Sequence, residues 1–283
     1  MRILIIGGKS SLGSELKLFL KSYFQVFTAG RSECDIYLDL SKNCDTEIDF
    51  QCDVVILTAA VFGGNDLNSY EENIIVNVLG TARSIKIANK FGAKHFILIS
   101  SMSILLNQIS PNYEIYSITK RQSEEVAEFV TNSIKMPLTI LRPTQLYGDN
   151  ESFKKHQPLL YKIIECVEMN KDVTFHGKKN SIRNYLHVND FNEIIRKVID
   201  LKVLGKYNCV NTKSTTLIET FNAAINAFNS NSNYHFDNSE DDIIENKFQA
   251  DFDFFLKIDF VPQINIINGM EMIANSKKLN YFN

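Results

Sequence analysis

A glycine-rich turn near the N-terminus constrains the fold of this chain more than any other feature. It follows the short apolar run at residues 2–6, reads Gly7-Gly8-Lys9-Ser10-Ser11-Leu12-Gly13, and leads into an amphipathic helical pattern. Such a turn lets a pyrophosphate approach the backbone and rest on the free amides and positive dipole end of the next helix. The sequence therefore predicts a dinucleotide site. A glycine-rich turn without function is the alternative, because Ser10 stands where many such turns carry a second glycine.

A tyrosine and a lysine four residues apart form a second candidate site. Tyr116 and Lys120 belong to a segment that continues as a helical pattern to Thr131, so both side chains are expected on one helix face. An ammonium beside a phenol favours the phenolate, and a lowered pKa would make Tyr116 a usable general acid or base near neutral pH. A solvated surface pair is the alternative interpretation.

Two serines follow the apolar run at residues 95–99. This run is typical of a buried strand, and Ser100 and Ser101 come at the end where doubly wound sheets carry their chemistry. A hydroxyl there can hydrogen-bond the substrate oxygen that Tyr116 protonates. A structural role in the turn is the alternative, since serines commonly stabilise turns.

In this order along the chain, the three segments resemble the extended short-chain dehydrogenase/reductase family, in its NAD(P)-dependent epimerase/dehydratase branch that acts on nucleotide sugars. The resemblance covers nearly the whole chain. Its further segments are Asp39, Leu57-Thr58-Ala59-Ala60, Asn77 to Thr81, Leu141-Arg142-Pro143, Leu146-Tyr147-Gly148, Arg183 to Asp190, Ile258 to Pro262 and Gly269-Met270. The resemblance implies an α/β fold with a Rossmann-type doubly wound parallel sheet and a smaller, mixed C-terminal substrate lobe.

The hydrophobic pattern favours the same fold class. Strand patterns alternate with helical patterns in the first half of the chain, which indicates a parallel sheet with helices on both faces. The strands are expected at about 2–6, 25–29, 36–38, 53–58, 95–99 and 138–141, and the helices at about 11–22, 68–91, 114–135, 157–169, 190–200 and 216–228. With the resemblance, this predicts a dinucleotide-binding domain at 1–143 with a return segment at about 184–211, and a substrate-binding lobe at 144–183 and 212–283.

The resemblance also implies roles for individual residues. Tyr116 is the expected proton donor or acceptor, Lys120 lowers its pKa and holds the nicotinamide ribose, and Ser101 orients the sugar oxygen. The expected coenzyme contacts are Gly7, Ser10, Ser11, Leu12, Gly13, Arg31, Ser32, Asp39, Leu40, Thr58, Ala59, Ala60, Asn77, Lys120 and Arg142. The expected substrate contacts are Ser101, Ser103, Tyr147 and Arg183. Arg183 is the candidate for the nucleotide diphosphate, and an ion pair with Asp190 is its structural alternative.

The segment after Ser101 departs from the family pattern. Where the family has a Val-Tyr-Gly turn shortly after its serine, this chain continues from Met102 to Asn107. One register makes Ser101 the catalytic hydroxyl, another puts Met102 in that place, and Ser103 is a weaker substitute; we prefer Ser101. Met102 and Ser103 also stand where the family's 4,6-dehydratases carry an Asp-Glu pair, which disfavours dehydration because the acid and base for it are lacking.

These features together predict an NAD(P)H-dependent reductase of a keto group on a nucleotide-linked deoxysugar, of the 4-keto-6-deoxyhexose type, in surface-polysaccharide sugar biosynthesis. The short spacing from Ser101 to Tyr116 resembles that of the compact ketoreductases. A nucleotide-sugar epimerase is the first alternative, because the same tyrosine and lysine can oxidise and re-reduce one carbon. A non-catalytic dinucleotide-binding protein is the second.

The turn after the second expected strand indicates which coenzyme is used. An NAD site commonly places a carboxylate there for the ribose 2′-OH, whereas a 2′-phosphate requires a cation. Gly30, Arg31 and Ser32 occupy this turn, and a guanidinium can bind a phosphate through its planar fork. We therefore expect NADPH to be preferred, with NADH as the alternative. Glu33 nearby acts against this preference.

Composition favours a cytoplasmic enzyme and argues against several other classes. The net charge is −3 without a basic stripe, so a nucleic-acid partner is not expected. An odd number of cysteines, without a C-x-x-C pair, suits reduced thiols in the cytoplasm. The five cysteines stand at positions 34, 44, 52, 166 and 209. The five histidines show no metal-ligand spacing, so no metal is expected.

Neither a targeting segment nor a membrane span is expected. The apolar run before Gly7 is too short for a signal-peptide core, and no apolar stretch approaches the roughly 18 residues that a span needs. A homodimer through the two long helices at 68–91 and 114–135 is one interpretation of their apolar faces. Burial of those faces against the sheet is the other.

Overall fold

The computed structural model describes residues 1–43, 48–110, 113–245 and 247–280, and within them the chain forms two compact units. Unit 1 comprises Met1–Pro143, Asn192–Asn208 and Phe252–Phe260, and unit 2 comprises Thr144–Phe191, Cys209–Asp251 and Val261–Asn283. The segment that returns to unit 1 is therefore shorter than 184–211, and a second segment near the C-terminus joins it. Cys44 lies outside the described residues.

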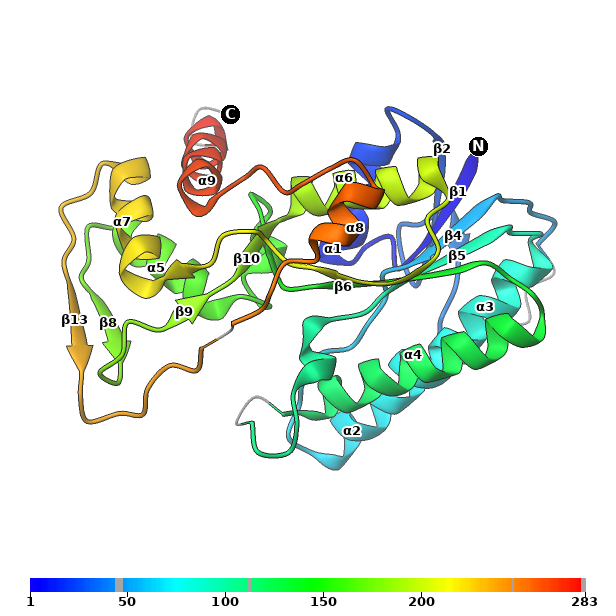
Figure 1. Ribbon diagram of the computed structural model, residues 1–283, viewed down its shortest axis with the longest axis horizontal. Helices are drawn as coiled ribbons and strands as arrows, with labels where there is room; N and C mark the ends of the chain where they lie inside the picture. The colour runs from blue at the N-terminus through cyan, green and yellow to red at the C-terminus, as the bar shows by residue number, and fades with distance from the viewer. Residues whose placement is uncertain (44–47, 111–112, 246, 281–283) are drawn as a thin grey trace. The chain divides into compact units, whose positions relative to one another are not determined.

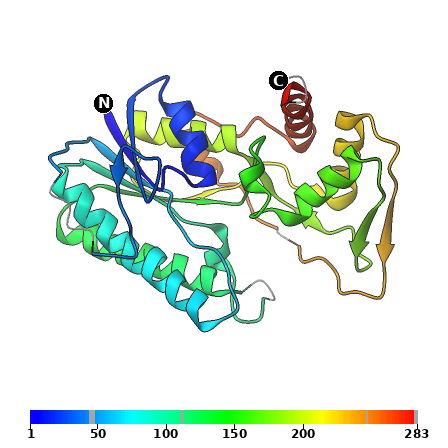
Figure 2. The ribbon, with the colours of Figure 1, turned by 180° about the vertical axis from the view of Figure 1, so that it is seen from behind.

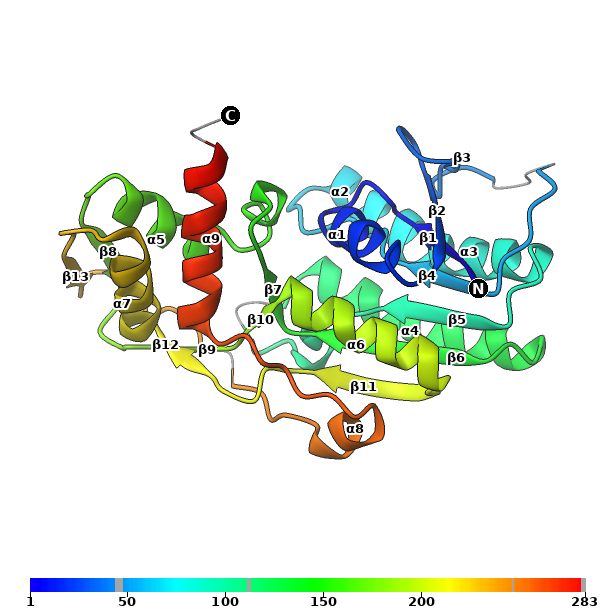
Figure 3. The ribbon, with the colours of Figure 1, turned by 90° about the horizontal axis from the view of Figure 1, so that it is seen from above.

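Unit 1 is built around a seven-stranded sheet in the order β11-β6-β5-β4-β1-β2-β3. All the pairs from β3 to β6 are parallel, and Figure 3 shows β6 between β5 and β11. The strands are β1 (Arg2–Ile6), β2 (Gln25–Gly30), β3 (Ile36–Tyr37), β4 (Val54–Leu57), β5 (His95–Ile99), β6 (Leu138–Pro143) and β11 (Gly205–Cys209). This order reverses direction between β1 and β4, where doubly wound sheets bind ligands. The predicted fold class is confirmed.

The central strands are apolar because both faces of the sheet are covered. The side chains of β4 and β5 are buried along their whole length, as parallel strands between two helical layers must be. Figures 1 and 2 show α3 and α4 on one face and α1 and α6 on the other. These helices are α1 (Ser11–Leu20), α3 (Gly80–Lys90), α4 (Ile115–Ser133) and α6 (Val188–Leu201). The short α8 (Phe252–Lys257) belongs to unit 1 as well, with Phe254 stacked on Tyr207.

The helix expected at 68–91 is interrupted. It consists of α2 (Leu67–Asn73), a π-helical segment η1 (Ile74–Leu79) and α3. The buried side chains of Asn73 and Asn77 explain the interruption, since both hydrogen-bond the backbone of the 61–63 loop. Hydrophobic periodicity does not record such contacts, and π segments occur frequently at functional sites.

Unit 2 contains small sheets and three longer helices. The strand pairs are β10 (Tyr185–His187) with β7 (Gln145–Tyr147), β12 (Thr215–Thr216) with β9 (Ile182–Arg183), and β13 (Tyr234–Asp237) with β8 (Val173–His176). The helix α7 (Leu217–Phe228) packs against α5 (Pro158–Glu168) and α9 (Ile266–Asn280). A capping box of Thr216 and Glu219 begins α7. Among the described residues, no helix combines the length and the apolar character needed to cross a membrane.

Candidate active site

The turn after β1 has the close backbone packing that a dinucleotide requires. Gly7 has a φ of +96°, and a Cβ on it would stand 2.4 Å from the amide nitrogen of Ala59. A Cβ on Gly13 would stand 2.2 Å from the carbonyl oxygen of Gly7. Side chains are therefore excluded at both positions, and the backbone is left open to a ligand. The residues present fit a dinucleotide pyrophosphate at this turn.

Two hydroxyl groups fix the turn. Ser10 caps α1, and its Oγ accepts a hydrogen bond from the Gly13 amide at 3.0 Å. The Oγ1 of Thr58, directly after β4, donates towards the carbonyl oxygens of Ile6 and Gly7 at 3.1 Å each and accepts from Ser10 at 3.2 Å. The expected contacts Ser11, Leu12, Ala59 and Ala60 lie in the same two segments, so the turn after β1 and the end of β4 form one site.

The residues expected to decide the coenzyme lie after β2 and β3. Arg31 and Ser32 are exposed in the turn after β2. Glu33 forms an ion pair with Lys9 of the glycine turn, so that part of its charge is compensated. Asp39 accepts hydrogen bonds from Ser41, which lower the pKa of its carboxyl. Leu40 is buried, and its carbonyl oxygen accepts a 2.6 Å hydrogen bond from Arg83.

The structure brings Ser101, Tyr116 and Lys120 together at the carboxyl end of β5. The Ser101 hydroxyl lies near enough to the Tyr116 phenol to lower its pKa, although burial raises this pKa more. The Lys120 Nζ lies 6.0 Å from the centre of the Tyr116 ring and donates a 2.6 Å hydrogen bond to the carbonyl oxygen of Ile99. The ring of Phe62 stacks on Tyr116, with 4.5 Å between the ring centres and 23° between the planes.

Met102 and Ser103, the two alternatives to Ser101 as the catalytic position, do not place a hydroxyl at the Tyr116 phenol. Met102 is buried, and Ser103 places a buried Oγ without a hydrogen-bond partner among the described residues. The backbone amide of Ser103 donates to the Ser101 Oγ at 3.1 Å. Ser101 is thus the serine whose hydroxyl meets the phenol.

Burial dominates the electrostatics of the tyrosine and lysine. It raises the pKa of Tyr116 above its ordinary value, and the Ser101 hydrogen bond only partly opposes this. Burial also lowers the pKa of Lys120 to about 8, against the opposing effect of the Glu124 carboxylate. The fall in the phenol pKa that we expected from the lysine does not occur, because the cost of removing a phenolate from water raises this pKa more than the Ser101 hydroxyl lowers it.

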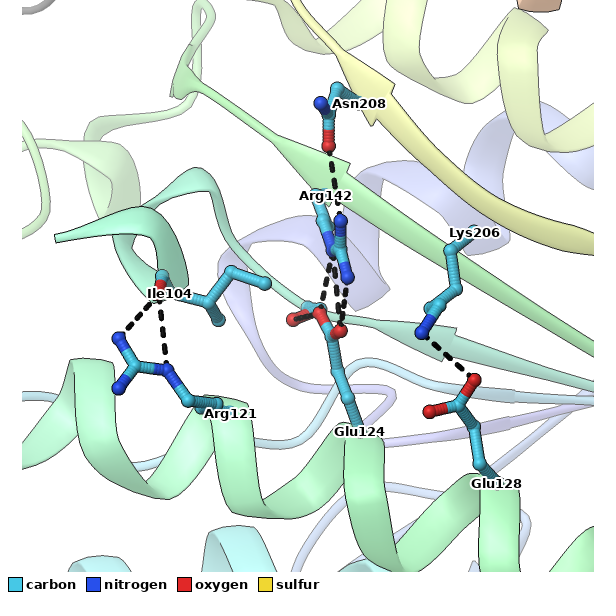
Figure 4. Close-up of polar contacts among 8 residues, drawn as sticks. Ile104, Arg121, Glu124, Glu128, Arg142, Lys206 and Asn208 are labelled. Atoms are coloured by element: carbon cyan, nitrogen blue, oxygen red, sulfur yellow. Dashed lines mark hydrogen bonds and ion pairs between the residues drawn. The ribbon is translucent and has the colours of Figure 1, made fainter.

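A buried ion pair supports the lysine from one turn further along α4. Glu124 accepts hydrogen bonds from the Arg142 guanidinium of β6, Nε to Oε1 at 2.9 Å and Nη2 to Oε2 at 2.6 Å, and from Ser100 Oγ at 2.5 Å. Figure 4 shows the two side chains facing each other, with Asn208 of β11 on the far side of Arg142. Arg142, expected among the coenzyme contacts, is hydrogen-bonded to Glu124 and Asn208 in this structure.

Asn77 connects the π segment to the same region. Its side chain forms two hydrogen bonds with the backbone of Val61, at 2.8 and 2.9 Å, and donates to Thr119 Oγ1 at 3.1 Å. Val61 precedes Phe62, and Thr119 precedes Lys120. Asn77 therefore ties the loop after β4 to the helix that carries the tyrosine and the lysine.

The expected substrate residues Tyr147 and Arg183 belong to unit 2. Tyr147 is fully buried, and its ring meets Tyr185 and His187 edge to face. The Nη1 of Arg183 donates to the carbonyl oxygen of Ile244 at 2.8 Å, and its buried Nε has no partner among the described residues. Asp190, the alternative partner of Arg183, accepts instead from the Ile264 amide at 2.8 Å.

Sequence reasoning missed Phe62 and Glu124, which contact Tyr116 and act on the Lys120 pKa, respectively. Glu124 carried a usable signal, because it follows Lys120 by the same four-residue step that separates Lys120 from Tyr116. The sequence gives no such signal for Phe62, since Phe62 and Tyr116 are 54 positions apart in the chain.

One surface group of unit 2 offers metal-ligand atoms. His176, Asp237 and Glu240 bring theirs within 4.8 Å of one another, in exposed or half-buried positions. Asp237 also accepts hydrogen bonds from Ser239, which lower its carboxyl pKa. Acidic surface groups of this kind are common without an ion, and no metal site is assigned.

A doubly wound sheet with a glycine turn at its reversal point and a serine, tyrosine and lysine after β5 defines a dinucleotide-dependent oxidoreductase-type enzyme. The comparison with protein families agrees: residues 3–210 match the NAD dependent epimerase/dehydratase family. The chain belongs to this family, which confirms the resemblance drawn from its sequence.

Individual relatives are distant. The dTDP-D-glucose 4,6-dehydratase of Dictyostelium discoideum is 25% identical over 250 residues, and the match covers 69% of this chain. The chain spans only 56% of the length of that relative.

The fold is shared with solved structures of other proteins. The UDP-glucuronic acid 4-epimerase of Bacillus cereus, in complex with NAD, has a TM-score of 0.77 at 18% identity, over 100% of this chain and 98% of that one. RMD from Pseudomonas aeruginosa, complexed with NADPH, has a TM-score of 0.79 at 14% identity, over 99% of both chains.

Proposed function

We propose that this protein reduces a keto group on a nucleotide-linked sugar of the 4-keto-6-deoxyhexose type, with NADPH preferred over NADH. The observation that carries the proposal is the meeting of the Ser101 hydroxyl, the Tyr116 phenol and the Lys120 ammonium after β5. A hydrogen-bonding hydroxyl, a proton donor and a fixed cation are the groups that carbonyl reduction requires.

The raised pKa of Tyr116 supports the direction of reduction. A phenol that burial keeps protonated at neutral pH can give its proton to the carbonyl oxygen of the sugar, while Ser101 donates a hydrogen bond to that oxygen. The bound nicotinamide coenzyme would supply the hydride to the carbonyl carbon. The Lys120 ammonium then stabilises the phenolate that Tyr116 becomes, and water returns the proton.

Other residues hold these groups in place. Gly7, Gly13, Ser10 and Thr58 shape the coenzyme turn, and the exposed Arg31 and Ser32 are available to a 2′-phosphate. Arg183, whose buried Nε has no hydrogen-bond partner within the described part of the chain, is the proposed contact of the nucleotide diphosphate. Tyr147, fully buried, and Ser103 complete the set of expected substrate residues.

An epimerase is the second candidate. The fold is shared with a UDP-glucuronic acid 4-epimerase over the whole chain, and the same tyrosine and lysine can remove and return a hydrogen at one carbon. Dehydration has less support, although the Dictyostelium relative is named a dehydratase. Met102 and Ser103 stand where dehydratases of the resembled family carry an acid and a base, and Met102 is buried.

We place the reaction in the cytoplasm. Cys34, Cys52, Cys166 and Cys209 are free thiols, as expected in a reducing compartment. The proposed partners are a nucleotide sugar and a second copy of this chain, with neither nucleic acid nor membrane involved.

The test is the oxidation of reduced nicotinamide, followed by absorbance, with a panel of nucleotide-linked 4-keto-6-deoxyhexoses and with NADPH and NADH side by side. Stoichiometric oxidation supports the reductase. Interconversion of sugar isomers at constant coenzyme supports the epimerase, and absence of both supports a binding protein.

One variant separates enzyme from binder. Tyr116→Phe removes the proton donor and should lower kcat by about 10²- to 10⁴-fold, with coenzyme binding unchanged. Tyr113→Phe, a half-buried tyrosine just before α4, is the matched control and should keep kcat near that of the wild type. Full activity of Tyr116→Phe would refute the role of Tyr116 as the proton donor.

A further inference from the structure

Arg121 joins the helix that carries Tyr116 and Lys120 to the turn that carries Ser101. Its Nε and Nη2 donate to the carbonyl oxygen of Ile104, at 3.2 and 2.6 Å. The same Nη2 donates to the carbonyl oxygen of Leu106 at 2.7 Å. Figure 4 shows the guanidinium at the end of this turn, next to Ile104. The side chain is half-buried, on the residue directly after Lys120.

The turn in question is a single short 3₁₀ helix, η2 (Met102–Leu105). Ser101 is its N-cap, and the Ser101 hydroxyl accepts a hydrogen bond from the Ser103 amide. At the two ends of η2, Ile104 N donates to Ser101 O at 3.3 Å and Leu106 N donates to Ser103 O at 3.0 Å. A helix this short is marginal by itself.

Arg121 supplies hydrogen-bond donors to carbonyl groups at the C-terminal end of η2. The last carbonyl groups of a helix have no partner within it and form its negative end. The Arg121 guanidinium donates to one of them, the Ile104 carbonyl, and also to the carbonyl of the C-cap residue Leu106, and its donors are fixed in a planar fork. A lysine carries the same charge but cannot hold two carbonyl groups in a fixed geometry.

Resting on the proposed function, we propose that Arg121 is a positioning residue that sets Ser101 against Tyr116. From α4 it donates hydrogen bonds to the carbonyl groups of Ile104 and Leu106, and it thereby fixes the C-terminal end of η2 relative to the helix of the tyrosine. The Ser101 hydroxyl, which is the N-cap of η2 and a partner of the Tyr116 phenol, is then held in one place. Arg121 itself transfers no proton and contacts no reacting atom.

A double-mutant cycle tests this role. Arg121→Gln should lower kcat by about 10- to 100-fold, the scale of a small misplacement at a reacting centre, and Arg121→Lys should restore little of it. The loss should disappear when Arg121→Gln is made in a Ser101→Ala background, because an effect that acts through Ser101 vanishes with its hydroxyl. The coenzyme Kd should stay unchanged throughout.

Arg196→Gln is the matched control. Arg196 is a partly buried arginine of α6 in the same unit, and its hydrogen bonds go to the carboxylates of Glu193 and Asp200. The kcat of the Arg196→Gln variant should stay near that of the wild type. An unchanged kcat of Arg121→Gln, or an equal loss with and without Ser101→Ala, would overturn the proposal.

Hydrogen–deuterium exchange separates this proposal from the proposed reaction, because it needs no substrate. In Arg121→Gln, exchange at the amides of residues 103–106 should become faster, while α1 stays as in the wild type. If the wild-type protein converts no sugar, the proposed function fails, and hydrogen–deuterium exchange still tests the role of Arg121. Faster exchange at η2 in Arg121→Gln supports the positioning of η2 by Arg121, and unchanged exchange overturns it.

Discussion

The carboxylate of Glu124 and the guanidinium of Arg142 form a buried, two-pronged ion pair one helical turn from Lys120, with side chains that are 5% and 17% exposed. The pair links α4 to β6, and Ser100 at the end of β5 adds a third hydrogen bond. Three elements of unit 1 are thus joined at one carboxylate, which also acts on the Lys120 pKa. The Glu124 carboxylate therefore contributes both to the stability of unit 1 and to the protonation of Lys120.

The pH dependence of reduction should reflect Lys120. Its pKa is about 8, so the ammonium is present below that pH and is lost as the pH rises through it. Tyr116 stays protonated over this range because burial raises its pKa. We expect kcat to fall above a pH of about 8, measured in buffers of constant ionic strength.

Glu124→Gln should move this descending limb to lower pH. The Glu124 carboxylate raises the Lys120 pKa against the effect of burial, so without it the ammonium deprotonates earlier, by about one pH unit. Glu125→Gln changes an exposed neighbour on the same helix and should leave the limb in place. A limb that does not move in Glu124→Gln would show that another group controls it.

Arg142→Met should strongly destabilise unit 1. It leaves the Glu124 carboxylate buried without its main partner, which costs about 3–5 kcal/mol in comparable cases. The double variant Glu124→Leu/Arg142→Met should recover most of this loss in denaturant unfolding, because no unpaired charge remains. Arg196→Met, which breaks a more exposed set of ion pairs on α6, should cost about 1 kcal/mol or less. Equal losses in the two single variants would contradict this reasoning.

Arg31→Gln should weaken the binding of NADPH and leave that of NADH unchanged. Loss of a guanidinium contact to the 2′-phosphate corresponds to roughly a tenfold change in Kd, which fluorescence titration can measure. Lys21→Gln removes an exposed cation at the end of α1 and should affect neither coenzyme. Equal weakening of both coenzymes by Arg31→Gln would assign the residue a different role.

Ile74→Glu should convert the proposed homodimer to a monomer. Leu67, Tyr70, Ile74 and Leu79 are exposed apolar side chains of the interrupted helix, and such a row favours burial against a second copy. Asn68→Glu adds the same charge at an exposed polar position nearby and should leave the mass from light scattering unchanged. A wild-type protein that is monomeric at high concentration would refute the expected dimer.

The sequence by itself determined the local elements of this protein. The apolar runs at 2–6 and 95–99 became β1 and β5 because each is too apolar to remain exposed, and the glycines after β1 fixed a turn that tolerates no Cβ. Tyr116 and Lys120 share a helix face because the helical period requires it. Chain order then sufficed to identify the fold class and the family.

Tertiary structure alone decided which side chains meet. Phe62 stacks on Tyr116, Glu124 pairs with Arg142, and Arg121 holds the turn of Ser101, although each pair joins separate segments of the chain. The pKa of Tyr116 rose where the sequence suggested a fall, because burial is a property of the packed unit and a spacing of four residues does not record it. Periodicity describes one segment at a time, whereas partners and burial depend on how the whole sheet and its helices pack.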